Sequence, residues 1–320
     1  MMGRLKKNLH TAIRIALCGW VVCFLSVAAF GADEKPQAKR VLIVGIDGCR
    51  ADVFPACHAA EHFPKMIKEG AFSGDVDVLG DRETGALTVT GHGWSCILTG
   101  VWADKHKVKA LEFKEANFRE FPTFFKRLKQ CRPETKTIAL VSWLPFAEHI
   151  FSADEGCRLV ADGEKVGFEN ADKAVAEQAT KALAEEDPDA IFVYFGDVDI
   201  NGHSYGFHPK APRYSAAVER VDTHVGKLLE AIHNRPNYAA EDWLVIVCTD
   251  HGGQGKHHMD GKNVPSIRQG FVIMDGPSVQ PGRIEGRHFN VDVAATALAH
   301  LGVKIDPLWR LDGEQIGLKP

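Results

Sequence analysis

The 320-residue chain lacks the features that define several large classes of protein. It has no internal repeat, low-complexity tract or heptad run, which argues against a solenoid, a disordered chain or a coiled coil. The chain has no CxxC pair of the kind that binds structural zinc. Its glycine-rich segments match neither the Walker nor the dinucleotide-binding fingerprint. There is also no basic patch: 38 Lys and Arg face 42 Asp and Glu, which argues against a nucleic-acid-binding scaffold.

What remains is an ordinary globular composition, with 45% hydrophobic and 25% charged residues. This length can form one large domain or two small ones. Because no segment has the composition of a linker, we expect a single domain over residues 33–320.

Residues 1–32 have the composition of a secretory signal peptide. A basic segment precedes an apolar run of 16 residues (15–30), and the small residues of AFGA follow. A retained membrane anchor is the alternative, but the run is short for a full span. We expect cleavage near Gly31 or Ala32 and a secreted or periplasmic protein without a stable membrane anchor. Removal of the signal peptide leaves 34 Lys and Arg residues against 42 Asp and Glu residues, a net charge of −8.

Six cysteines lie beyond the predicted cleavage site. An oxidising compartment permits disulfides, and Cys131–Cys157 and Cys49–Cys57 are the pairs we would choose, although the sequence does not fix the connectivity. Cys96 and Cys248 stand in apolar surroundings and are expected to be buried as small hydrophobic residues.

Short apolar runs alternate with amphipathic stretches along the rest of the chain. Strands are predicted at 41–47, 73–79, 137–142, 190–199, 243–250 and 270–276. Helices are predicted at 58–70, 93–100, 122–130, 171–187, 212–234 and 291–302. This alternation predicts an α/β fold with a doubly wound, mostly parallel sheet and helices on both faces.

Three of the predicted strands end on an aspartate: Asp47, Asp199 and Asp250. Histidines follow two of them, His203 in DINGH and His251 in TDHGG. Open α/β sheets bind ligands at the carboxyl ends of their strands. Carboxylates and imidazoles gathered there would repel or be poorly solvated unless a cation binds them. The sequence therefore predicts a metal site, with two ions, and hence an enzyme.

The ligand types favour zinc, although manganese, iron or cobalt also accept nitrogen and oxygen ligands. The DxxGH motif is expected to place Asp199 and His203 across a turn, with Gly202 letting the backbone fold back. Each motif alone is weak, and any of the aspartates could simply cap a turn. Three such motifs at strand ends make a specific combination.

The segments IDGCRAD, TVTGHGWSCILTGVWADKH, FGDVDINGHSYGFHP and TDHGGQGKHH resemble, in this order, those of the alkaline phosphatase superfamily. They are most similar to its type I phosphodiesterase/nucleotide pyrophosphatase branch. The resemblance covers nearly all of residues 41–315 and implies an alkaline phosphatase-like catalytic domain.

The resemblance also implies a role for each matching residue. Asp199 and His203 would bind the first zinc, with a third histidine from the loop after TDHGG. His258 fits that position better than its neighbour His257. The second zinc would have three ligands: Asp47, Asp250 and His251.

By the same resemblance Thr90 would be the nucleophile and a metal ligand. It precedes a predicted helix, whose free amide groups and positive dipole end suit a phosphate. Thr88 is the nearest rival, and capping the helix is the structural alternative for either threonine. The chain departs from the family at Gly93, where Asn is common, so backbone amides or His92 would have to substitute.

The implied activity is hydrolysis of a small phosphate ester through a covalent phosphothreonine, with two divalent ions, as in a phosphodiesterase. A phosphomonoesterase and a phosphonate hydrolase remain alternatives on this scaffold. A sulfatase is disfavoured because Cys49 lacks the CxPxR-like context. A phosphoglycerate mutase would need a Ser nucleophile and an inserted domain. A non-catalytic metal-binding protein is the alternative from a different class.

Overall fold

The structure is a computed structural model that describes residues 37–320. The predicted signal peptide lies outside these residues. Within residues 37–320 no helix combines the length and the apolar composition needed to cross a membrane.

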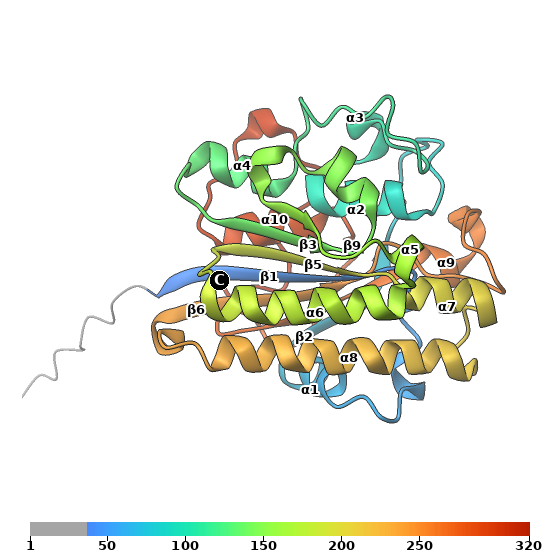
Figure 1. Cartoon of the computed structure of the whole chain (residues 1–320). Coiled ribbons are helices and arrows are strands. Elements are labelled where there is room, and N and C mark those ends of the chain that lie inside the picture. The colour runs from blue at the N-terminus through green and yellow to red at the C-terminus, as the bar shows by residue number, and fades with distance from the viewer. Residues whose placement is uncertain (1–36) are drawn as a thin grey trace, which may run out of the picture. The chain divides into compact units, whose positions relative to one another are not determined.

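One nine-stranded sheet forms the centre of the fold (Figure 1). Its order is β4-β3-β5-β1-β6-β7-β2-β8, with β9 paired to β2. The strands from β4 to β6 are parallel, whereas β7 is antiparallel to both of its neighbours, β6 and β2. The strands are β1 (Ala38–Ile46), β2 (Ala71–Asp77), β3 (Thr137–Val141), β4 (Cys157–Leu159), β5 (Ala190–Phe195), β6 (Glu241–Cys248), β7 (Gln269–Asp275), β8 (Gly282–Arg283) and β9 (His288–Phe289).

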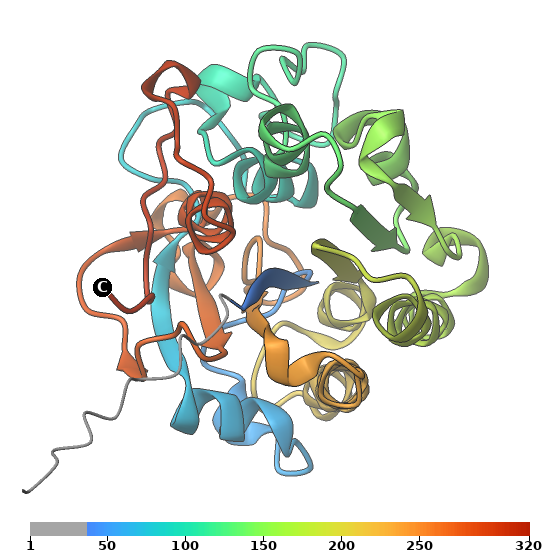
Figure 2. The same cartoon turned by 90° about the vertical axis from the view of Figure 1, so that its left-hand side faces the viewer.

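Helices cover both faces of this sheet (Figures 1 and 2). Helices α1, α6 and α8 pack on one face, and α2, α4 and α10 pack on the other. The mostly parallel, doubly wound sheet predicted from the sequence is confirmed. The helices are α1 (His62–Glu69), α2 (Thr90–Thr99), α3 (Ala103–His106), α4 (Phe124–Cys131), α5 (Gly163–Val166), α6 (Phe168–Glu185), α7 (Asp197–Tyr205), α8 (Pro212–His233), α9 (Pro265–Arg268) and α10 (Asp292–His300). Short helical turns are η1 (Phe54–Ala56), η2 (Phe146–Ile150), η3 (Ala153–Glu155), η4 (Tyr238–Ala240), η5 (Gly261–Asn263) and η6 (Pro307–Trp309).

Strand β1 shows why the sheet is buried on both faces. Its side chains alternate between two hydrophobic cores, with Leu42 and Val44 in one and Val41 and Ile43 in the other. A strand covered on both sides must be apolar at every position, which explains the unbroken run VLIV. The run ends at Ile46, and Asp47 then leaves the sheet at its carboxyl edge.

The prediction that one strand continues to Asp199 was wrong. β5 ends at Phe195, and α7 begins at Asp197. The carboxylate of Asp172 accepts hydrogen bonds from the backbone N–H groups of Gly196 and Asp197, at 3.1 and 2.8 Å. These bonds satisfy amides that a helix start leaves free, so they favour a helix directly after the strand.

The expected disulfides are not formed, since all six cysteines within residues 37–320 are free. The buried thiol of Cys57 donates instead to the carbonyl oxygens of Val53 and Ser215, at 3.5 and 3.7 Å. The Cys49 thiol contacts the carbonyl oxygen of Arg50. In the other expected pair, Cys131 ends α4 at an exposed position whereas Cys157 begins the edge strand β4.

Candidate metal centre and nucleophile

Asp47, Asp250 and His251 form one buried group at the carboxyl edge of the sheet. Asp47 follows β1, and the other two residues follow β6, which pairs with β1 in parallel. Parallel neighbours end at the same edge, so the three side chains converge. The Nε2 atom of His251 lies 3.6 Å from Asp47 Oδ1 and 3.3 Å from Asp250 Oδ2. This spacing brings three ligand atoms around one point.

Asp199, His203 and His258 form a second group. Its two histidine Nε2 atoms are 3.0 Å apart. Asp199 Oδ2 lies 3.4 Å from His203 Nε2, and Asp199 Oδ1 lies 3.6 Å from His258 Nε2. His258 comes from the loop after β6.

Asp199 and His203 do not lie across a turn, as the sequence analysis expected. They lie four residues apart on α7, and that spacing puts them on one helical face. The glycine at 202 serves packing instead, because a Cβ atom there would lie 2.2 Å from the ring of Phe207.

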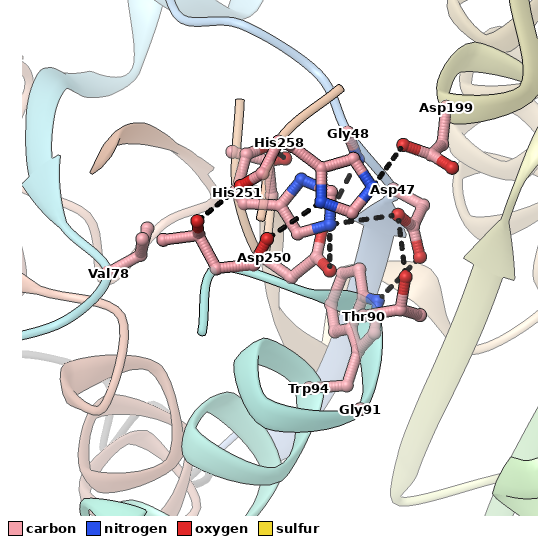
Figure 3. Close-up of polar contacts among 12 residues, drawn as sticks. Asp47, Gly48, Val78, Thr90, Gly91, Trp94, Asp199, Asp250, His251 and His258 are labelled. Carbon is pink, nitrogen blue, oxygen red and sulfur yellow. Dashed lines mark hydrogen bonds and ion pairs between the residues drawn. The ribbon is translucent and has the colours of Figure 1, made fainter. Parts of the chain in front are cut away.

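The two groups adjoin each other, and Figure 3 shows His251 of the first beside His258 of the second. The rings of His251 and His258 stack with their centroids 3.9 Å apart and their planes at 21°. Burial and the charge of Asp47 raise the pKa of Asp199 well above its usual range. The two groups therefore make one centre with three carboxyl groups and three imidazoles.

All three histidines of this centre are oriented by backbone carbonyl oxygens. The Nδ1 atoms of His203, His251 and His258 lie 2.9, 2.9 and 2.7 Å from the carbonyl oxygens of Lys256, Gly252 and Thr88, respectively. A carbonyl oxygen only accepts, so each Nδ1 carries the proton and each Nε2 presents its lone pair to the centre. This arrangement is typical of metal-binding histidines.

The protonation states of these side chains indicate that the centre binds cations and is not a hydrogen-bond network complete in itself. Burial lowers the pKa of His251 and of His258 to about 3, so both rings are neutral. Burial, followed by repulsion from neighbouring aspartates, raises the pKa of Asp250 well above its usual value. Asp199 Oδ1, Asp250 Oδ2 and His251 Nε2 are buried without a hydrogen-bond partner. Unpaired carboxylate oxygen and imidazole nitrogen are the donor atoms that zinc accepts, so the chemistry of these residues fits metal binding.

Thr90 lies beside this centre as the first residue of α2. Its hydroxyl is 3.4 Å from Asp47 Oδ1 and does not cap the helix, because Val89 is the N-cap residue and no side chain caps α2. The first-turn amide groups are therefore left for another acceptor. The rival Thr88 has a structural contact: its hydroxyl donates to the carbonyl oxygen of His258 and accepts from the amide of Gly261.

Gly93 is required by the approach of α2 to Asp250. A Cβ atom at this position would lie 2.6 Å from Asp250 Cβ and 2.8 Å from its carbonyl oxygen, so the Asn common in the family does not fit. His92 does not substitute for it, because its Nε2 atom points to the buried Cys96 thiol at 3.3 Å. Backbone amides of the first turn of α2 are the remaining candidates for holding a phosphate oxygen.

A third cluster with metal-ligand side chains is formed by His92, Cys96 and His106, all buried. Both histidine Nε2 atoms lie 3.3 Å from Cys96 Sγ. However, His106 Nδ1 accepts a hydrogen bond from the amide of Val108 at 3.1 Å, so its proton is on Nε2. This is the opposite tautomer to that of the three histidines above. It favours a hydrogen bond to the thiol over metal binding.

Two supporting residues were not identified from the sequence. The indole of Trp94 donates to Asp47 Oδ2 at 3.0 Å, and the Tyr194 hydroxyl donates to the same oxygen at 2.7 Å. Tyr194 reaches Asp47 through the register of β5 with β1, which cannot be read from the sequence. Arg50 is a structural residue: it pairs with Asp52 and donates to two backbone carbonyl oxygens.

Exposed apolar side chains lie on segments that adjoin the start of α2. Leu87, Leu111 and Met259 are 36%, 52% and 54% exposed. Backbone hydrogen bonds join Leu87 to the segment at 109 and Thr88 to Met259. Leu111 lies against Gly91, where a Cβ atom would be 3.3 Å from its Cα atom. The surface around Thr90 is thus partly apolar.

A family model for type I phosphodiesterase/nucleotide pyrophosphatase matches residues 41–265. The chain is 40% identical over 70 residues to ectonucleotide pyrophosphatase/phosphodiesterase family member 7 of Homo sapiens, covering 22% of this chain and 14% of that protein. It is 32% identical over 136 residues to the phosphopentomutase of Methylobacterium sp. (strain 4-46), covering 41% of this chain and 30% of that protein. The matched stretches thus span less than a third of either relative.

Solved structures share the fold at low identity. A putative sulfatase from Bacteroides thetaiotaomicron has a TM-score of 0.66 at 12% identity, covering 88% of this chain and 74% of that one. Murine ectonucleotide pyrophosphatase/phosphodiesterase 5 has a TM-score of 0.60 at 15% identity, covering 84% of this chain and 96% of that one.

Proposed function

The chain belongs to the type I phosphodiesterase/nucleotide pyrophosphatase family, and we propose that it hydrolyses small phosphodiesters at the centre around Thr90. One observation carries the proposal. Two groups of three potential ligand side chains adjoin a hydroxyl at the start of a helix. Within each group the ligand atoms lie within 4.8 Å of one another. Such an arrangement suits the in-line displacement of a phosphate ester.

The proposed ligands of the first ion are Asp199, His203 and His258. Those of the second are Asp47, Asp250, His251 and the Thr90 hydroxyl. Zinc is the ion proposed, because both groups mix imidazole nitrogen with carboxylate oxygen. When bound, the two ions would neutralise charge on the phosphate and lower the pKa of the nucleophile.

Thr90 is the proposed nucleophile. Its Oγ1 atom forms a bond to phosphorus while the bond from phosphorus to the leaving alcohol breaks. The proton of the hydroxyl leaves with that alcohol, and the phosphothreonine keeps the second ester group of the substrate. Water then hydrolyses the bond between Thr90 and phosphorus, which releases a phosphate monoester and restores the hydroxyl. A structure of murine ectonucleotide pyrophosphatase/phosphodiesterase 5 with AMP contains a threonine-to-alanine variant described as inactive, which supports a threonine in this role.

The start of α2 is the proposed site for the phosphate oxygens. The amides of the first turn have no side-chain cap, and they point toward the end of the helix that Thr90 occupies. Free N–H groups and the positive end of the helix dipole stabilise an anion without any additional cationic side chain.

Phosphoryl transfer to a second sugar position is the other candidate, favoured by the similarity to phosphopentomutase over 41% of this chain. A sulfatase activity is disfavoured despite the shared fold, because Cys49 lacks a CxPxR-like context and is fully buried. We also propose that the protein is exported, on the composition of residues 1–32.

The test is a substrate panel assayed with added zinc: bis-p-nitrophenyl phosphate, p-nitrophenyl phosphate, phosphonoacetate and a pentose phosphate. Fastest turnover of the diester supports the proposal, whereas isomerisation of the pentose phosphate supports the mutase. A protein that binds two zinc ions and turns over none of the four would be a binding protein instead.

A further inference from the structure

The two oxygens of Asp47 have different surroundings. Oδ2 accepts two hydrogen bonds, from Trp94 Nε1 at 3.0 Å and from the Tyr194 hydroxyl at 2.7 Å. Oδ1 faces the Thr90 hydroxyl at 3.4 Å and His251 Nε2 at 3.6 Å (Figure 3). One oxygen is therefore held by the core, and the other is left for the centre.

The two donors are themselves fixed. Trp94 is fully buried, and its ring meets those of Phe192 and Tyr194 edge-on, with centroids 5.7 Å apart in each case. β1 makes room for the indole at Gly45, where a Cβ atom would lie 2.4 Å from the Trp94 ring. Tyr194 stands on β5 directly opposite Gly45 in the parallel register. Neither donor can turn away without repacking the core.

We propose that Trp94 and Tyr194 are positioning residues that make Asp47 a single-oxygen ligand and thereby set the affinity of the Asp47–Asp250–His251 site for its ion. An indole N–H group can only donate a hydrogen bond. Trp94 therefore stabilises the carboxylate of Asp47 and cannot bind an ion itself. With Oδ2 engaged twice, the carboxylate presents Oδ1 alone, next to the nucleophile. Outer hydrogen bonds of this kind commonly change metal affinity by about 10–100-fold.

The carboxylate of the other site, Asp199, has no such support. Asp199 Oδ1 is buried without a hydrogen-bond partner, and Asp199 Oδ2 has only the 3.4 Å contact with His203. Loss of the two donors should therefore weaken the binding of the ion at the Asp47–Asp250–His251 site and leave the affinity for the other ion unchanged. This asymmetry separates the proposal from a general loss of packing.

The inference rests on the proposed function, in that it requires two zinc sites. The experiment titrates the metal-free protein with zinc in the presence of a competing chromogenic chelator. The variants are Trp94→Phe and Tyr194→Phe, each of which removes one donor and keeps a ring. The matched control is Trp243→Phe, because Trp243 is a buried indole that also donates to a carboxylate, Glu241 at 2.8 Å, at the opposite end of its strand.

Wild-type protein should bind two zinc ions. In each Asp47-directed variant the affinity of one ion should fall about 10–100-fold while the other is retained, and added zinc should restore turnover. In an Asp199→Ala background only the weakened site should remain visible. Trp243→Phe should keep both affinities.

Different failures have different meanings. If wild-type protein binds no zinc, the proposed function itself is wrong. If it binds two ions and both variants match it, or if Trp243→Phe weakens zinc as much, the positioning role is wrong. Should Trp94→Phe not fold, Tyr194→Phe decides the question, since it removes only one oxygen atom.

Discussion

The Nδ1 atom of His258 donates a hydrogen bond to the carbonyl oxygen of Thr88 at 2.7 Å, which ties the last histidine of the centre to the segment leading into Thr90. Its neighbour His257 is exposed and makes only a backbone bridge with Gln254. We therefore predict that His258→Ala loses one zinc ion and more than about 100-fold in turnover, since ligands outweigh the groups that only support them. His257→Ala is the matched control and should keep both ions. Equal losses in the two variants would contradict this assignment.

Thr90→Ala should reduce turnover by about 10⁴-fold or more, because a hydroxyl that forms the covalent intermediate has no substitute. Zinc content should stay close to wild type because Asp47, Asp250 and His251 remain to hold the second ion. Thermal stability should also be retained, as the Thr90 side chain does not cap α2. Thr88→Val is the control: it removes the neighbouring hydroxyl and its structural contacts but should retain most of the turnover. Mass spectrometry of a quenched reaction with a diester should find a phosphoryl group on residue 90 that still carries the remaining ester group. A Thr88→Val variant as inactive as Thr90→Ala would reverse the choice of nucleophile.

Stabilisation by zinc should grow as the pH rises from 5 to 8. In the metal-free protein, burial first and then neighbouring aspartates raise the pKa values of Asp199 and Asp250 above 3.8. The folded state then holds protons that the unfolded chain releases, so metal-free stability falls as the pH rises through the raised values. Zinc needs the ionised carboxylates, and it competes with fewer protons at pH 8. Thermal unfolding with and without zinc at both pH values measures this, and a larger gain at pH 5 would contradict it.

Gly93→Ala should damage the centre out of proportion to its size. The added Cβ atom would lie 2.6 Å from Asp250 Cβ, so a proposed ligand or the start of α2 must move. Overpacking of this kind typically costs about 1–3 kcal/mol, and turnover should fall further because the ligand moves. Gly85→Ala is the comparison: its φ of 68° makes it strained, yet nothing lies within 4 Å of the added atom. That variant should lose about 1 kcal/mol of stability and keep its zinc and activity.

Diesters with longer apolar leaving groups should be better substrates than methyl esters, because exposed Leu111 and Met259 lie on segments that contact Gly91 and Thr88, on either side of Thr90. Each methylene that becomes buried adds up to about 0.8 kcal/mol of binding free energy. Leu111→Ser should flatten the dependence of kcat/KM on chain length and leave the methyl ester unaffected. Leu308→Ser, at an 83% exposed leucine in η6, is the control. A flat series in the wild-type enzyme would contradict the prediction without affecting the proposed chemistry.

Two of the three strand-end aspartates could be predicted from the sequence, because apolar runs mark buried parallel strands and such strands end at a common edge. Asp47 and Asp250 show this, since they follow the paired strands β1 and β6. The ligand residues of the two groups were assigned by family resemblance, and their roles stay predictions. Their grouping in space is an observation.

The remaining features depend on contacts between distant segments. Asp199 and His203 lie on a helix rather than a turn because Asp172, some 25 residues earlier, caps that helix. The support of Asp47 by Tyr194 requires the register of β1 with β5. Local patterns carry no record of either contact.

Strand β1 also limits how the sequence can change. It is paired on both sides, with Val41 opposite Ala190 of β5 and Leu244 of β6. A one-residue insertion or deletion between Val41 and Gly45 would turn the carboxylate of Asp47 toward the opposite face and bring a bulkier residue than Gly45 beneath Trp94. The length of β1 therefore fixes the position of Asp47: one apolar side chain of the strand can replace another, but the number of residues in the strand cannot change.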